Sequence, residues 1–161
     1  MCRSEIIKRL GGTVKETFSC DGFPVRAAGK PQCGICTSCL LRRLSLEAAG
    51  LSCFDESEHY LTDLTGPVNR AAPSADQLND IRAMEWQYQT LAECLSQEDP
   101  WQALIKEFPT LQTICSELAV YRNYPEDELR RNLLRLYAEY CAEWQNFSAR
   151  RNFIRLGRRA A

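Results

Sequence analysis

The stretch that decides the fold is CGICTSCLLRR at residues 33–43, in which three cysteines follow one another at intervals of three. A fourth cysteine precedes them, so the spacing is Cys-x12-Cys-x2-Cys-x2-Cys. Zinc takes four thiolates in a tetrahedron, and a Cys-x2-Cys turn brings two sulfurs onto one ion. We therefore predict one structural zinc ion, without an open position for water, bound by Cys20, Cys33, Cys36 and Cys39.

The residues between the cysteines fit a zinc knuckle. Gly34 occupies a position where such a turn often requires a positive φ. A helix that starts near Cys39 would favour its thiolate form. A redox Cys-x2-Cys pair does not explain four cysteines. An iron–sulfur cluster is the stronger competitor, but its cysteine runs usually continue with a further cysteine and proline, and neither follows Cys39 directly.

The bulk composition is that of a soluble globular protein with no general attraction to polyanions. The net charge is −1, and no apolar run reaches the roughly 20 residues of a membrane-spanning helix. Nine cysteines are an odd number, which argues against a closed set of disulfides. With no recognisable export signal, we expect a cytoplasmic protein and no membrane partner. The single histidine, His59, is expected to be a surface or packing residue.

The N-terminal third is expected to be a small unit organised by the metal. Helical spacing of apolar residues predicts a helix at residues 3–10 that ends at the glycine pair 11–12. Residues 14–18 alternate roughly and are interpreted as a short strand or extended arm. The cysteine loop has no apolar period, and a helical rhythm returns from Thr37 to Gly50.

The remainder is expected to be helical. Residues 66–73 are rich in Gly, Pro and Ala and are interpreted as a linker. Helices are predicted to follow Ser74, the Asp99-Pro100 pair and Thr110, and the longest to begin at Pro125. The predicted fold class is therefore mainly α: a zinc-knuckle unit at residues 1–65, followed by a helical bundle at residues 74–161.

Two groups of arginines are candidate anion-binding sites. Arg42 and Arg43 follow the knuckle and would contact a phosphate or carboxylate, or else lie on a solvated or ion-paired face. The C-terminal arginines form the only basic cluster, at residues 150–159. Phe153 is the only aromatic among them, so we do not expect nucleic acid as a partner.

Several motifs in order resemble the C-terminal part of the 7-cyano-7-deazaguanine synthase family. They are SEIIK at residues 4–8, TFSC at 17–20, CGICTSCLLRR at 33–43 and EAAGL at 47–51. The family is similar in its Thr-aromatic-Ser-Cys arm, its Cys-Gly-x-Cys-x-Ser-Cys knuckle that runs into a Leu-x-Arg helix, and its Ala-Gly-Leu turn. The resemblance covers about residues 3–60, a little over a third of the chain.

The resemblance implies descent from an ATP-dependent ligase of the α/β PP-loop ATPase type. Members adenylate the carboxylate of a 7-carboxy-7-deazaguanine and convert it to a nitrile with ammonia, on the route to queuosine. The four matching cysteines are the family's zinc ligands, and the metal there supports the active-site wall without performing chemistry. No catalytic residue is carried over to this chain.

The departures from the family limit what is expected. The Ser-Gly-Gly-x-Asp-Ser loop that holds pyrophosphate is missing, so we expect ATP only where a partner or another segment supplies that site. The helical tail is similar to extended homologues in prokaryotic defence loci, and Met1 is interpreted as an internal methionine, a split-gene start or the start of a remnant. Two functions stay open: a non-catalytic portion of a carbon–nitrogen ligase that acts beside a nucleotide-binding chain or as a homo-oligomer, and a zinc-knuckle interaction module in a defence or deazapurine-related complex.

Overall fold

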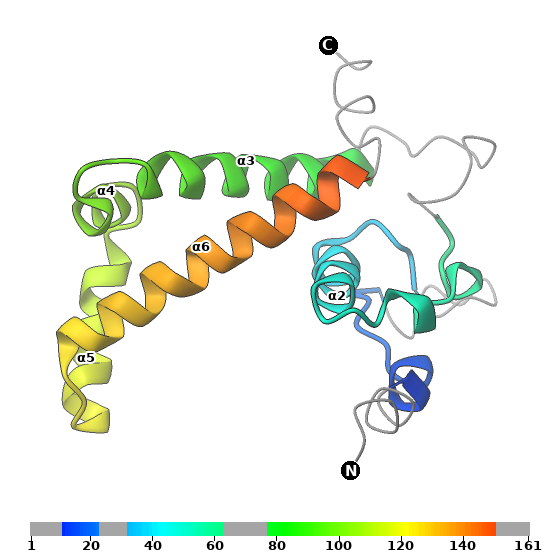
Figure 1. The fold of residues 1–161 in the computed structure, drawn as a ribbon, viewed down its shortest axis with the longest axis horizontal. Helices are drawn as coiled ribbons and strands as arrows, with labels where there is room; N and C mark the ends of the chain where they lie inside the picture. The colour runs from blue at the N-terminus through cyan, green and yellow to red at the C-terminus, as the bar shows by residue number, and fades with distance from the viewer. Residues whose placement is uncertain (1–10, 23–31, 63–76, 151–161) are drawn as a thin grey trace. The chain divides into compact units, whose positions relative to one another are not determined.

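The computed structural model describes residues 11–22, 32–62 and 77–150, and this part of the chain is mainly helical, as predicted (Figure 1). Within these three ranges no β-strand forms, and one isolated parallel bridge joins Gln32 to Tyr60. The elements in chain order are helical residues 11–16, α2 (Thr37–Ala48), the short 3-10 helices η1 (Ser52–Phe54) and η2 (Ser57–His59), α3 (Gln77–Leu95), α4 (Pro100–Glu107), α5 (Thr110–Arg122) and α6 (Glu126–Arg150).

The chain divides into two compact units. The first comprises Met1–Met84 together with Asn146–Ala161, and the second comprises Glu85–Gln145. The predicted linker at residues 66–73 lies outside the described residues, so a domain boundary there stays a prediction. No helix in the described ranges is long and apolar enough to cross a membrane.

Helix α2 begins and ends where the sequence predicts. Cys36 is its N-cap with extended backbone, Cys20 and Cys33 lie before the cap, and Cys39 lies in the first turn. At the other end Gly50 has φ +70°, and its N–H donates to the carbonyl of Glu47 at 3.0 Å. The N–H of Leu51 donates to Leu46 at 2.7 Å. This pair of bonds closes the helix because glycine adopts the left-handed conformation without strain.

The segment before the cysteines differs from the prediction. Residues 11–16 are helical, so Gly11 and Gly12 do not end a helix, and the extended segment expected at residues 14–18 is mostly helical. Glycine inside a helix costs only about 1 kcal/mol relative to alanine, so packing can override it. A Cβ on Gly11 would lie 2.4 Å from Cε1 of Phe54, so glycine is what lets that ring approach. The helix predicted at residues 3–10 lies outside the described residues.

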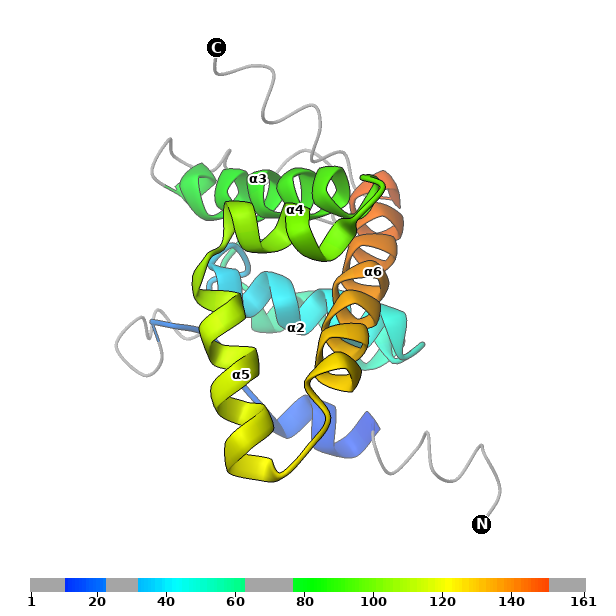
Figure 2. The same cartoon turned by 90° about the vertical axis from the view of Figure 1, so that its left-hand side faces the viewer.

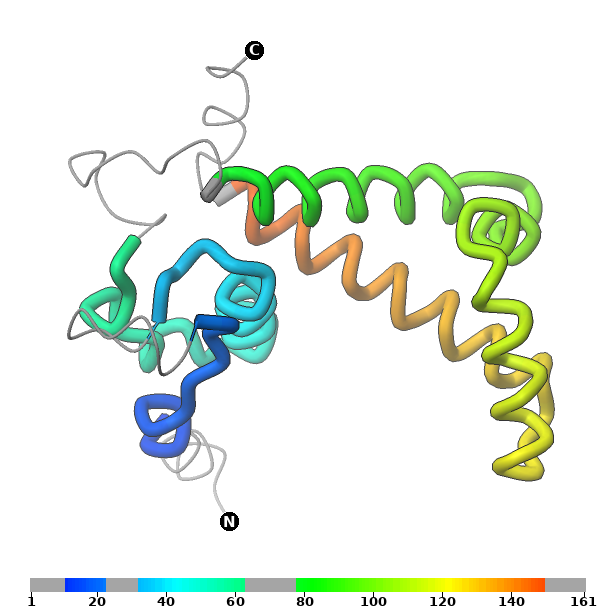
Figure 3. Tube along the Cα trace, turned by 180° about the vertical axis from the view of Figure 1, so that it is seen from behind, coloured from blue at the N-terminus to red at the C-terminus, as the bar shows by residue number. Residues whose placement is uncertain are grey.

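The second unit is a set of helices with its own apolar core. One buried cluster in it consists of Leu91, Cys94, Leu104 and Cys141, which come from α3, α4 and α6. Asp99 caps α4 as predicted: its side chain accepts a hydrogen bond from the N–H of Gln102 at 3.1 Å. Figure 3 shows α4 at the turn between α3 and α5, with α6 returning toward α3.

Helices α5 and α6 leave part of their apolar surface exposed. α5 ends at Arg122, its C-cap Asn123 has φ +49°, and α6 begins three residues later at Glu126 (Figure 2). The predicted stripe on α6 is buried at Cys141 and Trp144, whereas Leu136 is 55% exposed. On α5 Cys115 is buried, whereas Ile114 and Leu118 are 46% and 41% exposed. The apolar stripe predicted on α6 is therefore wider than the part of it that is buried.

Candidate metal centre

The four predicted cysteines lie together and are buried. The Sγ atoms of Cys20, Cys33, Cys36 and Cys39 all lie within 4.8 Å of one another. The two pairs with recorded distances are Cys33–Cys39 at 3.9 Å and Cys36–Cys20 at 4.0 Å. A tetrahedron with metal–sulfur bonds of about 2.3 Å has edges of about 3.8 Å. The arrangement is therefore close enough to hold a metal ion in tetrahedral coordination.

Backbone geometry brings the knuckle into this shape. Gly34 has φ +84°, as predicted, and a Cβ there would lie 2.0 Å from the carbonyl oxygen of Thr62. The N–H of Thr62 donates to the carbonyl of Cys33 at 3.0 Å, so the segment after η2 packs directly on the turn. Any side chain at position 34 would force these two segments apart. The glycine is thus needed both for its φ and for the close approach.

The arm that carries Cys20 is held against α2 and the knuckle. The hydroxyl of Ser19 donates to the carbonyl of Ser38 at 3.3 Å. The hydroxyl of Ser38 in turn donates to Oδ1 of Asp21. The N–H of Cys33 donates to Sγ of Cys20 at 3.4 Å. These bonds bring a residue thirteen positions away in the chain onto the same site.

Hydrogen bonds within the cluster favour one thiolate even before metal binds. The thiols of Cys36 and Cys39 hydrogen bond to Cys33 and hold its pKa well below the ordinary value, with help from backbone N–H groups. The hydrogen bond with Cys33 raises the pKa of Cys36 to about 11, and the hydrogen bond between Cys33 and Cys39 raises the pKa of Cys39. The metal-free cluster therefore carries protons that a metal ion must displace.

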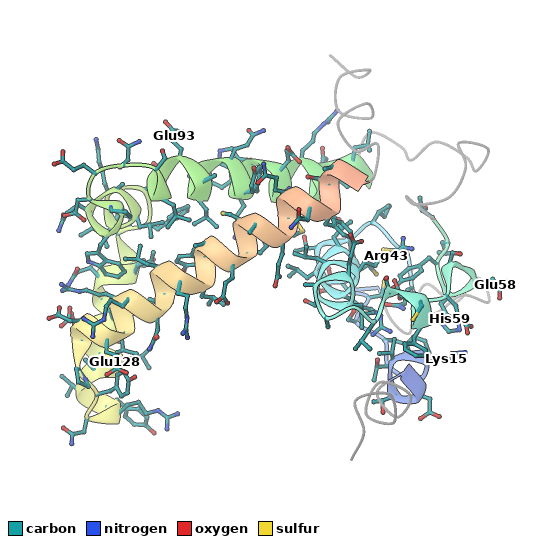
Figure 4. All side chains as sticks on the ribbon, viewed as in Figure 1. Lys15, Arg43, Glu58, His59, Glu93 and Glu128 are labelled. Atoms are coloured by element: carbon teal, nitrogen blue, oxygen red, sulfur yellow. The ribbon has the colours of Figure 1, made fainter. Side chains whose placement is uncertain are left out.

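A buried ionic network adjoins the cysteines and was not predicted. The guanidinium of Arg43 pairs with Oδ2 of Asp55 at 3.2 Å and lies over the ring of Tyr60, 4.3 Å from its centroid. The hydroxyl of Tyr60 donates to Oδ1 of Asp55 at 2.7 Å. Tyr60 belongs to the same buried cluster as the four cysteines. Figure 4 shows Arg43 on α2 within this unit.

The structure thus favours the ion-paired interpretation of the two arginines over anion binding. Arg43 is 3% exposed, which leaves it no access to a ligand in solution. Arg42 donates to the hydroxyl of Thr17 at 2.9 Å and to the carbonyl of Val14 at 2.6 Å. Both side chains therefore tie α2 to neighbouring segments. Periodicity gave no signal for Asp55 and Tyr60, because they enter the network through irregular segments.

The other residues considered from sequence lie outside the cluster. Nε2 of His59 lies 3.7 Å from a carboxylate oxygen of Glu56, and the ring makes an edge contact with Phe18, consistent with a surface or packing role. Lys15 also pairs with Glu56, at 2.5 Å. Cys53 is exposed, whereas the cysteines of the second unit are buried. The basic cluster at residues 150–159 begins at Arg150, the last residue of α6, and its remaining residues lie outside the described part of the chain.

Comparison with known proteins adds no assignment. No protein family, curated protein or solved structure matches the chain.

Proposed function

We propose that the chain binds one zinc ion through Cys20, Cys33, Cys36 and Cys39, and that this ion has a structural role. The observation that carries the proposal is the short separation of the four sulfurs, all within 4.8 Å of one another. A single tetrahedral ion requires such spacing, and thiolates are the ligands that zinc prefers in structural sites.

The same spacing argues against a four-iron cluster. Each cysteine of such a cluster binds a different iron, so the width of the cluster separates its sulfurs in addition to the iron–sulfur bonds. Sulfur pairs at 3.9 and 4.0 Å instead suit four bonds to one ion. A single iron would have the same geometry, so the identity of the ion has to be measured.

A structural role follows from coordination and burial. Four protein ligands complete the tetrahedron and leave no position for a water that the metal could activate. All four cysteines are buried, and Cys39 has no exposed surface. In the described residues the buried cluster contains only Ile35 and Tyr60 besides the four cysteines, so in this proposal the metal supplies much of the free energy that orders it.

The test is metal analysis of the purified protein by plasma mass spectrometry, with an absorption spectrum of the same sample. We expect one zinc per chain and no visible colour. Iron in stoichiometric amount, with thiolate-to-iron absorption, would contradict the zinc assignment. A protein that binds no metal even when refolded with excess zinc would contradict the metal centre itself.

We further propose that the chain is the zinc-bearing portion of a 7-cyano-7-deazaguanine synthase-like ligase and is not catalytic alone. The ordered motifs at residues 17–20, 33–43 and 47–51 support this proposal. Because the given sequence contains no pyrophosphate loop, ATP would bind on a partner chain or another segment. In this proposal the chain acts in the cytoplasm, and its cysteine unit supports the wall of an active site completed elsewhere.

The second candidate is a non-catalytic zinc-knuckle module that serves assembly in a defence or deazapurine-related complex. Arg42 and Arg43 favour this candidate. The ion pair of Arg43 with Asp55 and the hydrogen bond of Arg42 to Thr17 engage both side chains within the chain, so they are not positioned to bind a substrate. Calorimetric titration of the zinc-loaded chain with ATP tests an assumption that both candidates share, namely that the chain alone does not bind ATP. Both predict no binding by the chain alone, and stoichiometric binding would contradict both. Conversion of a 7-carboxy-7-deazaguanine with ATP and ammonia, after a nucleotide-binding partner is added, would support the first candidate.

A further inference from the structure

The strongest unexplained surface is an apolar row along α5. Ile114, Leu118 and Tyr121 are 46%, 41% and 80% exposed. They are spaced i, i+4 and i+7, so they lie on one face of the helix. The side of the helix next to this row faces its own unit, because Cys115 is 1% exposed and Leu111 packs against the core cluster. An apolar face of this kind marks an interaction site.

The charges beside the row indicate what binds there. In a heptad that places Ile114 and Tyr121 at d and Leu118 at a, Glu117 falls at g and Arg122 at e. In a parallel pair of identical helices, a residue at g faces the residue at e five positions later on the partner. Glu117 of one copy therefore meets Arg122 of the other, twice across a two-fold axis.

The two charges are available for this contact. Within the described part of the chain, no ion pair involves Glu117 or Arg122. The Arg122 guanidinium lies 5.3 Å from the centroid of the Tyr121 ring, at the edge of the apolar row. In an antiparallel pair, g faces g and e faces e, so Glu117 would meet Glu117 and Arg122 would meet Arg122. The sequence of α5 thus suits a parallel pairing with itself and opposes the antiparallel one.

We propose that the chain forms a parallel homodimer through α5, with Ile114, Leu118 and Tyr121 at the seam and Glu117–Arg122 pairs on its flanks. The inference is independent of the metal and of the proposed function, since it rests on residues of the second unit alone. The dimer contact is small, because α5 has 13 residues, so association is concentration-dependent.

The test is sedimentation velocity and light scattering of the full zinc-loaded chain over a series of concentrations. Tyr121→Glu and Val120→Glu form a matched pair, because the residues are adjacent, 80% and 84% exposed, and lie on different faces of α5. We expect Tyr121→Glu to abolish the dimer and Val120→Glu to retain it. Leu118→Glu should also give a monomer, and circular dichroism of each variant checks that the helices persist.

Charge reversal tests the orientation. Glu117→Arg and Arg122→Glu should each weaken the dimer several-fold, and the double variant should restore it. In an antiparallel dimer the Glu117→Arg variant would associate as well as the parent chain, and that result would overturn the parallel pairing. A parent chain that stays monomeric at every concentration would refute the dimer, whether a distinct protein or another segment of the chain covers the row. Equal loss in the Tyr121 and Val120 variants would refute the seam.

Discussion

Arg43 and Asp55 form an ion pair at 3.2 Å in which the two side chains are only 3% and 7% exposed. The pair ties α2 to the segment after η1, and Tyr60 contacts both partners. Tyr60 also packs in the buried cluster of the four cysteines. Tyr60 therefore packs against both the ion pair and the cysteine cluster, so disturbing either should affect the other.

Asp55→Asn should destabilise the first unit strongly. It leaves the Arg43 charge buried without its carboxylate, and breaking such a pair costs about 3 kcal/mol or more. Tyr60→Phe removes only the hydroxyl and keeps the ring beneath Arg43, so its cost should be about 1 kcal/mol. Denaturant unfolding of the zinc-loaded variants measures both. Glu56→Gln is the control, because Glu56 belongs to an exposed pair with Lys15 and its loss should matter little. Equal effects of the Asp55 and Glu56 variants would contradict the importance of burial.

Cys39→Ser should release the metal and unfold the cysteine loop. Serine keeps the size of the side chain but removes a thiolate ligand, and a structural zinc contributes on the order of 10 kcal/mol to folding of small sites. Metal analysis and circular dichroism provide the readout. Cys53→Ser is the matched control in the same unit, because Cys53 is exposed and lies outside the cluster. Retention of stoichiometric zinc by Cys39→Ser would rule out a four-cysteine site.

The clustering of the four cysteines could be predicted from sequence because its information is local. Three of the ligands lie within seven residues, and coordination chemistry fixes which residue types and spacings suit one ion. The positive φ of Gly34 and the end of α2 at Gly50 were predictable for the same reason. The helix starts after Asp99 and at Thr110 also agree with the sequence signals.

What the sequence did not predict depends on contacts between distant residues. The helix at residues 11–16 contains two glycines, and the ring of Phe54, about forty positions away, occupies the space that a Cβ on Gly11 would need. The network of Arg43, Asp55 and Tyr60 likewise joins α2 to irregular segments that show no periodicity. The exposure of the apolar row on α5 could not be predicted either, because periodicity identifies an apolar face and not what covers it.

The glycine pair at positions 11 and 12 provides a sharp test of the packing. Gly11→Ala should destabilise the first unit, because the new Cβ would lie within 2.6 Å of three atoms of the Phe54 ring. Gly12→Ala meets nothing within 4 Å and lies in the same helical turn. Alanine there should raise stability by up to about 1 kcal/mol through its helix propensity. Thermal unfolding of the two variants compares them, and the reverse order of stability would contradict the contact with Phe54.

Zinc removal should unfold the two units unequally. The core of the second unit is formed by Leu91, Cys94, Leu104 and Cys141, none of which belongs to the metal cluster. We therefore expect a strong chelator to abolish amide protection at residues 32–62 while residues 85–145 keep theirs. Hydrogen exchange read by mass spectrometry measures each segment in the full chain. Readdition of zinc should restore protection of the first segment, which distinguishes metal loss from aggregation. Simultaneous loss of protection in both segments would show that the helical unit depends on the metal centre, contrary to the independent core inferred from its packing.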